Sequence, residues 1–389
     1  FLSAFTHEVR GLHEAAYLLA AFALSSQLLG LVRDRLLAGT FGTGETLDIY
    51  YAAFRIPDLL FATVASLLSL YALLPILSRL EEESQGLAFA FLRRSLLVFF
   101  FGMALVSGIV FLIAPVLIPL IAPGLAGGEG YADLLLLSRI LLLQPILLGA
   151  SNIVAALTQL RHRFFLYAIS PLLYNLGIIA GIIFFYPTAG IVGLGWGVLL
   201  GASMHFLVQA VFFFQEGTSE RVLPPARFWK SLWEVLWLSV PRTLSLAAGQ
   251  VSLLILVALA SLFAPGSIAV FMLAFNLQAV PLTIIGVSYS VAAFPTLARL
   301  FASGNNKEYL WHIEVALRHI LFWALPATIL VIVLRAQIVR IVLGSGAFDW
   351  NATRLTAAAL ALFILSLVAQ RVALLIARAY YAAGKTAIP

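Results

Sequence analysis

Long apolar segments recur along the whole chain and constrain its fold more than any other feature. Each is long enough to cross the ~30 Å hydrocarbon core of a bilayer as a helix, and a helix satisfies its own backbone hydrogen bonds there. A mean hydropathy of +1.05 excludes an ordinary soluble domain. The pattern predicts an all-α polytopic membrane protein with about ten transmembrane helices, at residues 13–40, 50–79, 87–121, 131–158, 164–186, 190–215, 232–262, 267–301, 309–343 and 353–383.

The connectors between these segments differ in charge and predict the orientation of the chain. Those after segments 3, 5 and 7 (APGLAGGEGYAD, YPTAG and APGS) carry almost no cations. The connectors after the even-numbered segments carry the basic residues Arg79, Arg161, Arg163, Arg221, Arg227, Lys230, Arg299, Lys307 and Lys385. Because basic connectors stay on the cytoplasmic side, the N-terminus is predicted to be cytoplasmic.

The same composition argues against several classes of function. The net charge of +6 comes from cations at the ends of apolar segments, so it is no nucleic-acid signal, and the absence of cysteine removes thiolate chemistry. His312 and His319 are seven residues apart and lack the spacing of a zinc helix, and no GxxxxGK[ST] loop is present. We therefore predict no enzyme activity, no metal, no cofactor and no nucleic-acid partner.

The longest polar connector, residues 216–230 (EGTSERVLPPARFWK), predicts the division into domains. It separates an N-terminal lobe of six helices (1–215) from a partial C-terminal lobe of four (231–389), and is itself expected to be a cytoplasmic linker. Three tryptophans recur at helical spacing at the end of this connector and just beyond it, at Trp229, Trp233 and Trp237, as expected where a helix enters the membrane.

Glycines recur at short intervals in segments 5 and 6. Gly177 and Gly181 form a GxxxG pair, and segment 6 repeats small residues at Gly193, Gly195, Gly197 and Gly201. Small residues let helix backbones approach closely within membranes. Close packing is favoured here over contact with a ligand.

One stretch, residues 28–60, concentrates charge between two apolar segments. It holds Arg33, Asp34, Arg35, Asp48, Arg55 and Asp58, in a chain of which only 10% is charged. Ionisable groups near bilayer depth are costly unless they pair or face water. They mark a candidate functional site.

Ordered motifs along the chain resemble those of the MurJ/MviN family, flippases for the peptidoglycan precursor lipid II within the MOP exporter superfamily. The resemblance is carried by residues 29–34 (LGLVRD), 41–44 with Asp48 (FGTG…D), 53–60 (AFRIPDLL), 164–177 (FFLYAISPLLYNLG), 280–295 (VPLTIIGVSYSVAAFP), 346–349 (GAFD) and 379–389 (AYYAAGKTAIP). It implies a MATE-like, two-lobed bundle whose cavity opens alternately to either side of the bacterial cytoplasmic membrane. It also implies about fourteen helices, of which about four would follow Pro389. The start at Phe1 instead of Met, and the end just after an apolar segment, lead us to expect a fragment with both ends missing.

The chain departs from the family pattern at several cationic positions. An earlier arginine of the first helix is replaced by Gln27, one of the second helix by Phe61, and an acidic-Arg pair of the eighth by Phe275-Asn276. The family's cation site draws on helices 7, 11 and 12, and the seventh-helix position falls near Leu256. Ion coupling is therefore not carried over.

Arg33 and Arg55 match basic positions of the family and are predicted to hold a substrate diphosphate, because arginine offers phosphate a planar fork of donors. Asp34 is expected to pair with a neighbouring cation, and Asp48 to make a gating contact between lobes. The alternative is that Arg33, Asp34 and Arg35 form a structural ion-pair network near the outer interface.

Three further residues complete the predicted substrate site. Arg242 follows Pro241 inside segment 7, and Gln250 lies eight residues on, ~12 Å along the axis. Arg242 either replaces a lost cation or snorkels to the interface. Asn276 and Gln278 either line the cavity or bond between helices. Arg371 is a lesser candidate, and Asn152, Asn175 and His205 are predicted to be satisfied within the N-terminal lobe.

We therefore expect a flippase that moves lipid II across the cytoplasmic membrane by alternating access, without covalent chemistry. The expected partners are lipid II, membrane lipids and cell-wall synthesis proteins. One alternative is an exporter of another lipid-linked oligosaccharide or amphiphile, which the missing arginines favour. Another is a membrane scaffold in cell-wall assembly that transports nothing.

Overall fold

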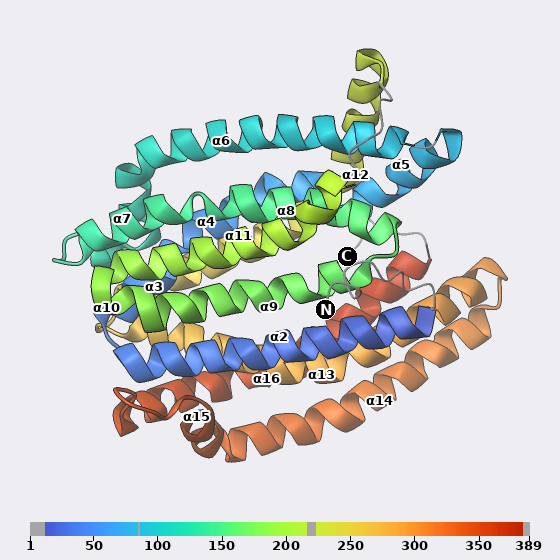
Figure 1. Ribbon diagram of the computed structural model, residues 1–389. Helices are drawn as coiled ribbons and strands as arrows, with labels where there is room; N and C mark the ends of the chain where they lie inside the picture. The colour runs from blue at the N-terminus through green and yellow to red at the C-terminus, as the bar shows by residue number, and fades with distance from the viewer. Residues whose placement is uncertain (1–11, 85, 216–222, 384–389) are drawn as a thin grey trace. The chain divides into compact units, whose positions relative to one another are not determined.

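The computed structural model describes residues 12–84, 86–215 and 223–383, and the described chain is helical throughout (Figure 1). For residues 282–296 of α13 it describes the backbone and not the side chains, so most of the motif at 280–295 lies outside the described side chains. The elements up to residue 143 are α2 (Leu12–Phe41), α3 (Glu45–Ala53), α4 (Arg55–Thr63), η1 (Ala65–Leu68), α5 (Leu70–Glu83), α6 (Leu87–Ile121), η2 (Pro123–Leu125) and α7 (Tyr131–Leu141). The later ones are α8 (Gln144–Leu160), α9 (Phe164–Ala180), the π-helix η3 (Gly181–Phe185), α10 (Tyr186–Ala189), α11 (Ile191–Gln215), α12 (Pro225–Ser261), α13 (Ser267–Ala302), α14 (Asn306–Val333), α15 (Arg335–Leu343) and α16 (Trp350–Ala382).

The ten predicted segments are all helical, although several of them are broken. Among the described residues, seven helices are long and apolar enough to cross a membrane, or eight if the bent pair Glu45–Thr63 and Ala65–Glu83 is one span. That pair bends by 43° at the break between Thr63 and Ala65, where the 3₁₀ turn η1 begins. The prediction of an all-α polytopic membrane protein is confirmed.

The chain forms two compact units. Unit 1 contains residues up to Leu37 together with Gly44–Ile268, and unit 2 contains Ala38–Thr43 together with the chain from Ala269. The predicted linker 216–230 does not coincide with this division, because the chain on both sides of it belongs to unit 1. Residues 216–222 lie outside the described chain, and residues 225–230 begin α12. The assignment of an inter-lobe linker remains a prediction.

Helix α12 belongs to unit 1 because polar contacts fix it to the broken second span. Ser66 bonds Thr243 at 2.8 Å and Ser69 bonds Ser239 at 3.2 Å, both between buried hydroxyls. Near one end of α5, Arg79 makes two hydrogen bonds with Glu234 at 2.7 and 3.1 Å.

The core of unit 1 is apolar and is built mainly from α5, α6, α8, α11 and α12. Leu73, Leu77, Phe91 and Leu157 are fully buried there. Beside it, α9 and α11 pack so closely that a Cβ on Gly177 would meet the backbone of Gly201. Gly181 and Gly197 face each other in the same way, so the predicted glycine packing is confirmed.

In unit 2, helices α14 and α16 pack along a seam of small and branched apolar residues. Ala324 meets Ile364 and Leu367, and further along Ala316 and Ile320 meet Leu375. The hydroxyl of Tyr309 donates to the carbonyl of Ala379 at 2.8 Å near the end of this seam.

Candidate functional site

Arg33 of α2 is held by a carboxylate on its own helix and an amide on α9. Its Nε and Nη2 donate to Oδ1 of Asp34 at 3.0 and 2.8 Å, and its Nη1 donates to Oδ1 of Asn175 at 3.0 Å. Asp34 is buried, while 22% of the Arg33 side chain stays exposed. The predicted pairing of Asp34 with a cation is confirmed. Arg33 also fits the structural ion-pair alternative, since three of its nitrogens are already in use.

Asn175 of α9 also bonds to α2 and to its own helix. Its Nδ2 donates to the hydroxyl of Ser26 at 3.3 Å and to the carbonyl of Pro171 at 3.1 Å. His205 and Ser151 likewise contact each other at 2.8 Å, and Gln209 donates to the same hydroxyl. The prediction that Asn175 and His205 are satisfied within the N-terminal part of the chain is confirmed.

Arg55 is the first residue of α4 and is buried next to the junction where α3 ends at Ala53. Its Nε donates to the carbonyl of Tyr51 at 3.2 Å, and its Nη2 pairs with Oδ2 of Asp58 at 3.2 Å. Its Nη1 is buried without a hydrogen-bond partner, as is the hydroxyl of Tyr51. Only 5% of the side chain is exposed, and its bonds to Tyr51 and Asp58 stabilise the junction of α3 and α4. Its predicted contact with a diphosphate remains untested.

Asp48 is buried in α3 and binds the turn that follows α12. Its Oδ2 accepts a hydrogen bond from the backbone N–H of Gly266 at 2.6 Å. Gly266 has a φ of +93°, a conformation that suits glycine. Asp48 therefore fixes the connector between α12 and α13. The predicted gating contact between lobes remains a prediction.

Arg242 differs from the other four charged residues of the predicted site because it is exposed and stacked on an aromatic ring. Its guanidinium carbon lies 4.0 Å from the ring centroid of Tyr71, at the start of α5. Tyr71 is 64% exposed. Within the described part of the chain, Arg242 makes no hydrogen bond or ion pair. A cation–π contact fixes one face of the guanidinium and leaves its N–H edges open.

The uncharged candidates separate into two groups. Gln250 lies two turns beyond Arg242 on α12 and is half-buried. Asn276 of α13 is half-buried and has interactions of its own, so it is not free. Gln278 donates to the carbonyl of Phe363 at 2.6 Å and to Ser366 at 2.9 Å, as predicted for a bond between helices. Gln250 and Asn276 remain candidates for contact with a substrate.

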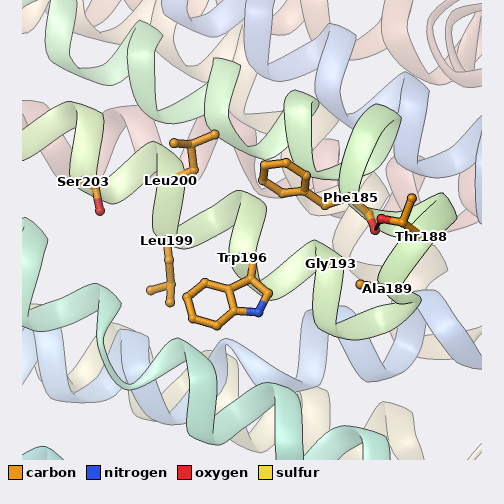
Figure 2. Close-up of a pocket in the computed structure, with 8 residues that line it drawn as sticks. All are labelled: Phe185, Thr188, Ala189, Gly193, Trp196, Leu199, Leu200 and Ser203. Carbon is orange, nitrogen blue, oxygen red and sulfur yellow. Dashed lines mark hydrogen bonds between the residues drawn. The ribbon is translucent and has the colours of Figure 1, made fainter.

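Figure 2 shows a pocket between η3, α10 and α11 in unit 1, with a volume of about 480 Å³. Phe185, Trp196, Leu199 and Leu200 line it, and Thr188 and Ser203 supply its hydroxyl groups. It carries no ionisable side chain and is unsuited to a phosphate. Among the residues that the structure describes, no group of three or more His, Asp or Glu side chains could hold a metal ion.

The Arg33–Asp34 pair leads to a stability prediction. Replacing Asp34 with alanine removes the carboxylate and leaves a half-buried cation, which is expected to cost about 2–3 kcal/mol, because breaking a buried pair costs more than the pair contributes. We expect a clearly lower melting temperature in detergent. The double variant Arg33→Met/Asp34→Ala should recover much of that loss. A double variant that loses as much stability as Asp34→Ala, or more, would contradict the pairing.

Comparisons with known proteins agree with this fold. The sequence profile of the family described as Lipid II flippase MurJ matches residues 37–389. A probable lipid II flippase MurJ of Rhizobium tropici is 29% identical over 355 residues, covering 89% of this chain and 66% of that protein. The lipid II flippase MurJ of Burkholderia cenocepacia is 25% identical over 378 residues, 95% of this chain and 73% of that protein. The chain thus spans about two thirds to three quarters of the length of these relatives.

Two solved structures show the same architecture. One is a lipid II flippase MurJ in an inward closed conformation, with a TM-score of 0.80 and 22% identity over 95% of this chain and 77% of that one. The other is an inward-facing MATE-family multidrug transporter of the MOP superfamily, with a TM-score of 0.79 and 16% identity, covering 93% of this chain and 82% of that one. At these identities the likeness supports the predicted MOP/MATE-like fold.

Proposed function

The chain belongs to the MurJ lipid II flippase family, and on that premise we propose that it moves lipid II, or a closely related lipid-linked precursor, from the inner to the outer leaflet of the bacterial cytoplasmic membrane. The movement proceeds by alternating access, with the N-terminus in the cytoplasm. It requires no covalent chemistry and no cofactor. Lipid II and membrane lipids are the proposed partners, together with proteins of cell-wall synthesis.

The observation that supports this proposal most is the open guanidinium of Arg242. Arg242 lies within the candidate span Pro225–Ser261, nine residues beyond Trp233, or ~13 Å along the axis. An exposed cation at that depth requires water or an anion. Its guanidinium stacks on the ring of Tyr71, 4.0 Å from the ring centroid. A phosphate group fits the open edge, because arginine binds phosphate through paired N–H donors.

The other charged residues take different parts in this proposal. Arg33 offers a second contact to the diphosphate when a phosphate oxygen displaces part of its bonding to Asp34 and Asn175. Arg55 stabilises the junction of α3 and α4, and Asp48 stabilises the turn between α12 and α13. Gln250 of unit 1 and Asn276 of unit 2 are each proposed as an uncharged contact to the sugar or peptide part of the substrate.

A related substrate is the second candidate, and the replaced arginines favour it. Phe61, where the family has an arginine, packs against the apolar core of unit 1. Gln27 and Asn276 are neutral. A substrate with fewer charges than lipid II, such as another lipid-linked oligosaccharide, would need fewer cations. A scaffold without transport is the third candidate, and an open Arg242 gives it no support.

The test is genetic and chemical at once. The gene for this protein is expressed in bacteria whose own flippase can be depleted. We expect growth rescue together with lipid II that becomes accessible to a probe added outside the cells. Normal protein levels without either effect would contradict the lipid II assignment. Profiling of the lipid-linked oligosaccharides that accumulate would then separate another substrate from a scaffold.

A further inference from the structure

Unit 2 contains a cation that the structure leaves without a counter-ion, Arg371 of α16. The residue is only 9% exposed, and its Nε is fully buried with no hydrogen-bond partner. Within the described chain it makes no hydrogen bond or ion pair at all. Four other arginines of unit 2 do have partners among the described residues: Arg318 pairs with Glu314, Arg335 donates to Ile332, Arg340 to Phe348 and Arg354 to Asn351.

The position of Arg371 along α16 rules out a topology charge at a helix end. The candidate span runs from Trp350 to Tyr380, so its central residue is 365. Arg371 is six residues from that centre, ~9 Å along the axis, inside the ~15 Å half-thickness of the hydrocarbon core. A cation at such depth is costly unless it is paired or reaches water.

The stem of Arg371 belongs to the seam between α14 and α16. Ile364, Leu367, Arg371 and Leu375 follow each other at intervals of three and four, which places them on one face of the helix. The residues on either side of Arg371 on that face pack against α14, at Ala324 for Leu367 and at Ile320 for Leu375. A methionine or leucine would serve this packing without the cost of the charge. Of the guanidinium nitrogens only Nε is fully buried without a partner, so the terminal fork keeps access to the surface.

Two polar residues lie close to Arg371 in sequence. Ser366, five residues before Arg371, accepts hydrogen bonds from Gln278 of α13 at 2.9 Å and from the exposed Gln370 at 2.7 Å. Gln370 is the direct neighbour of Arg371 in sequence, ~100° around the helix axis from it. Residues 367–369 are apolar, so Gln370 is the polar side chain of α16 nearest to Arg371 in sequence.

We propose that Arg371 is a binding residue of unit 2 for the diphosphate of the lipid-linked substrate, with Gln370 beside it. This inference rests on the proposed function and adds a cation that the family motifs do not supply. Asn276 leaves the predicted eighth-helix position neutral, and Arg371 restores a positive charge to the same unit. The planar fork of arginine suits two oxygens of a phosphate, and its fixed stem lowers the cost of ordering it on binding.

The test uses Arg371→Met in the full-length protein, because methionine keeps the stem in the seam and removes the charge. Purified protein in nanodiscs of zwitterionic lipid is titrated with undecaprenyl diphosphate. We expect the dissociation constant to rise roughly tenfold or more, as for loss of a charge-assisted contact. We also expect an unchanged or higher melting temperature without ligand, since an unpaired buried charge is lost. A merely structural arginine would show no change in affinity, or an affinity that falls only together with stability.

Two variants serve as controls. Arg354→Met lies on the same helix and removes an exposed cation bonded to Asn351, so its affinity should equal that of the wild type. Arg371→Lys keeps a charge without the fork and should lie between Arg371→Met and the wild type. If Arg371→Met has a lower melting temperature than the wild type, its loss of affinity is no longer specific to the charge. The dissociation constant of Arg371→Lys is then the deciding measurement. Wild-type affinity in both variants of Arg371 overturns the proposal.

Two further titrations identify which anion Arg371 binds, and a comparison with the cell assay separates this binding site from transport. Inorganic pyrophosphate should bind more weakly than the lipid diphosphate and show the same dependence on Arg371. Nanodiscs with phosphatidylglycerol should not remove that dependence. An Arg371 effect seen with phosphatidylglycerol alone would overturn the assignment to a diphosphate. Binding that depends on Arg371 in a protein that fails to rescue flippase-depleted cells would refute the proposed function and leave this site standing.

Discussion

Replacing Arg242 with alanine is expected to abolish growth rescue in flippase-depleted cells at normal protein levels. Arg242 is an exposed cation of unit 1 whose N–H groups have no hydrogen-bond partner among the described residues, and its guanidinium already stacks on Tyr71. Losing charge-assisted bonds to a phosphate costs about 1.5–3 kcal/mol, which is roughly a 10- to 150-fold loss of affinity. The measurement is lipid II exposure at the outer leaflet, with protein level read by immunoblot.

The chain offers a matched control in Arg139 of α7. Arg139 also stacks on an aromatic ring, with its guanidinium carbon 4.5 Å from the centroid of Phe111, but its Nε already donates to the carbonyl of Phe111. Arg139→Ala should therefore leave lipid II exposure close to that of the wild type. Tyr71→Phe should keep most activity and Tyr71→Ala lose a larger share, because the ring and not the hydroxyl holds the guanidinium. Full activity in Arg242→Ala would remove the main support for the proposed diphosphate contact.

The fold was predictable from sequence because each apolar segment is constrained locally. A helix in a bilayer satisfies its own backbone, so length and hydropathy are enough to predict it. The breaks were harder to predict. Segment 50–79 contains Pro57 and Pro75, yet its 43° bend falls between them, at the break between Thr63 and Ala65. That bend is stabilised by Ser66 and Ser69 through bonds to α12, which lies more than 160 residues away in sequence.

The candidate site was predictable in its residue types but not in its pairings. Arg33 and Asp34 are neighbours in sequence, so their pairing could be expected. The contact of Arg33 with Asn175 spans 142 residues, and no local pattern indicates it. Tyr71 was missed for the same reason, since its position over Arg242 depends on how α5 meets α12. The lack of a counter-ion at Arg371 is likewise a tertiary property.

The glycines between α9 and α11 give the second large expected effect, this time on stability. A Cβ on Gly177 would collide with the backbone of Gly201, and a Cβ on Gly201 with the backbone of Tyr174. Backbone cannot move aside as a flexible side chain can, so the two helices must separate and lose contacts along their length. Gly177→Ala and Gly201→Ala are each expected to cost about 2–4 kcal/mol, at the upper end for single substitutions.

Two glycines of α6 make this prediction specific. Ideal Cβ atoms on Gly102 and Gly108 meet nothing within 4 Å. Alanine there should be neutral or stabilise the helix by up to about 1 kcal/mol, because it restricts the unfolded chain and favours helix. Melting temperatures in detergent should therefore fall for the α9 and α11 variants and hold or rise for the α6 variants. Equal effects in both sets would show that helix propensity, and not the close approach of two backbones, decides which glycines the fold requires.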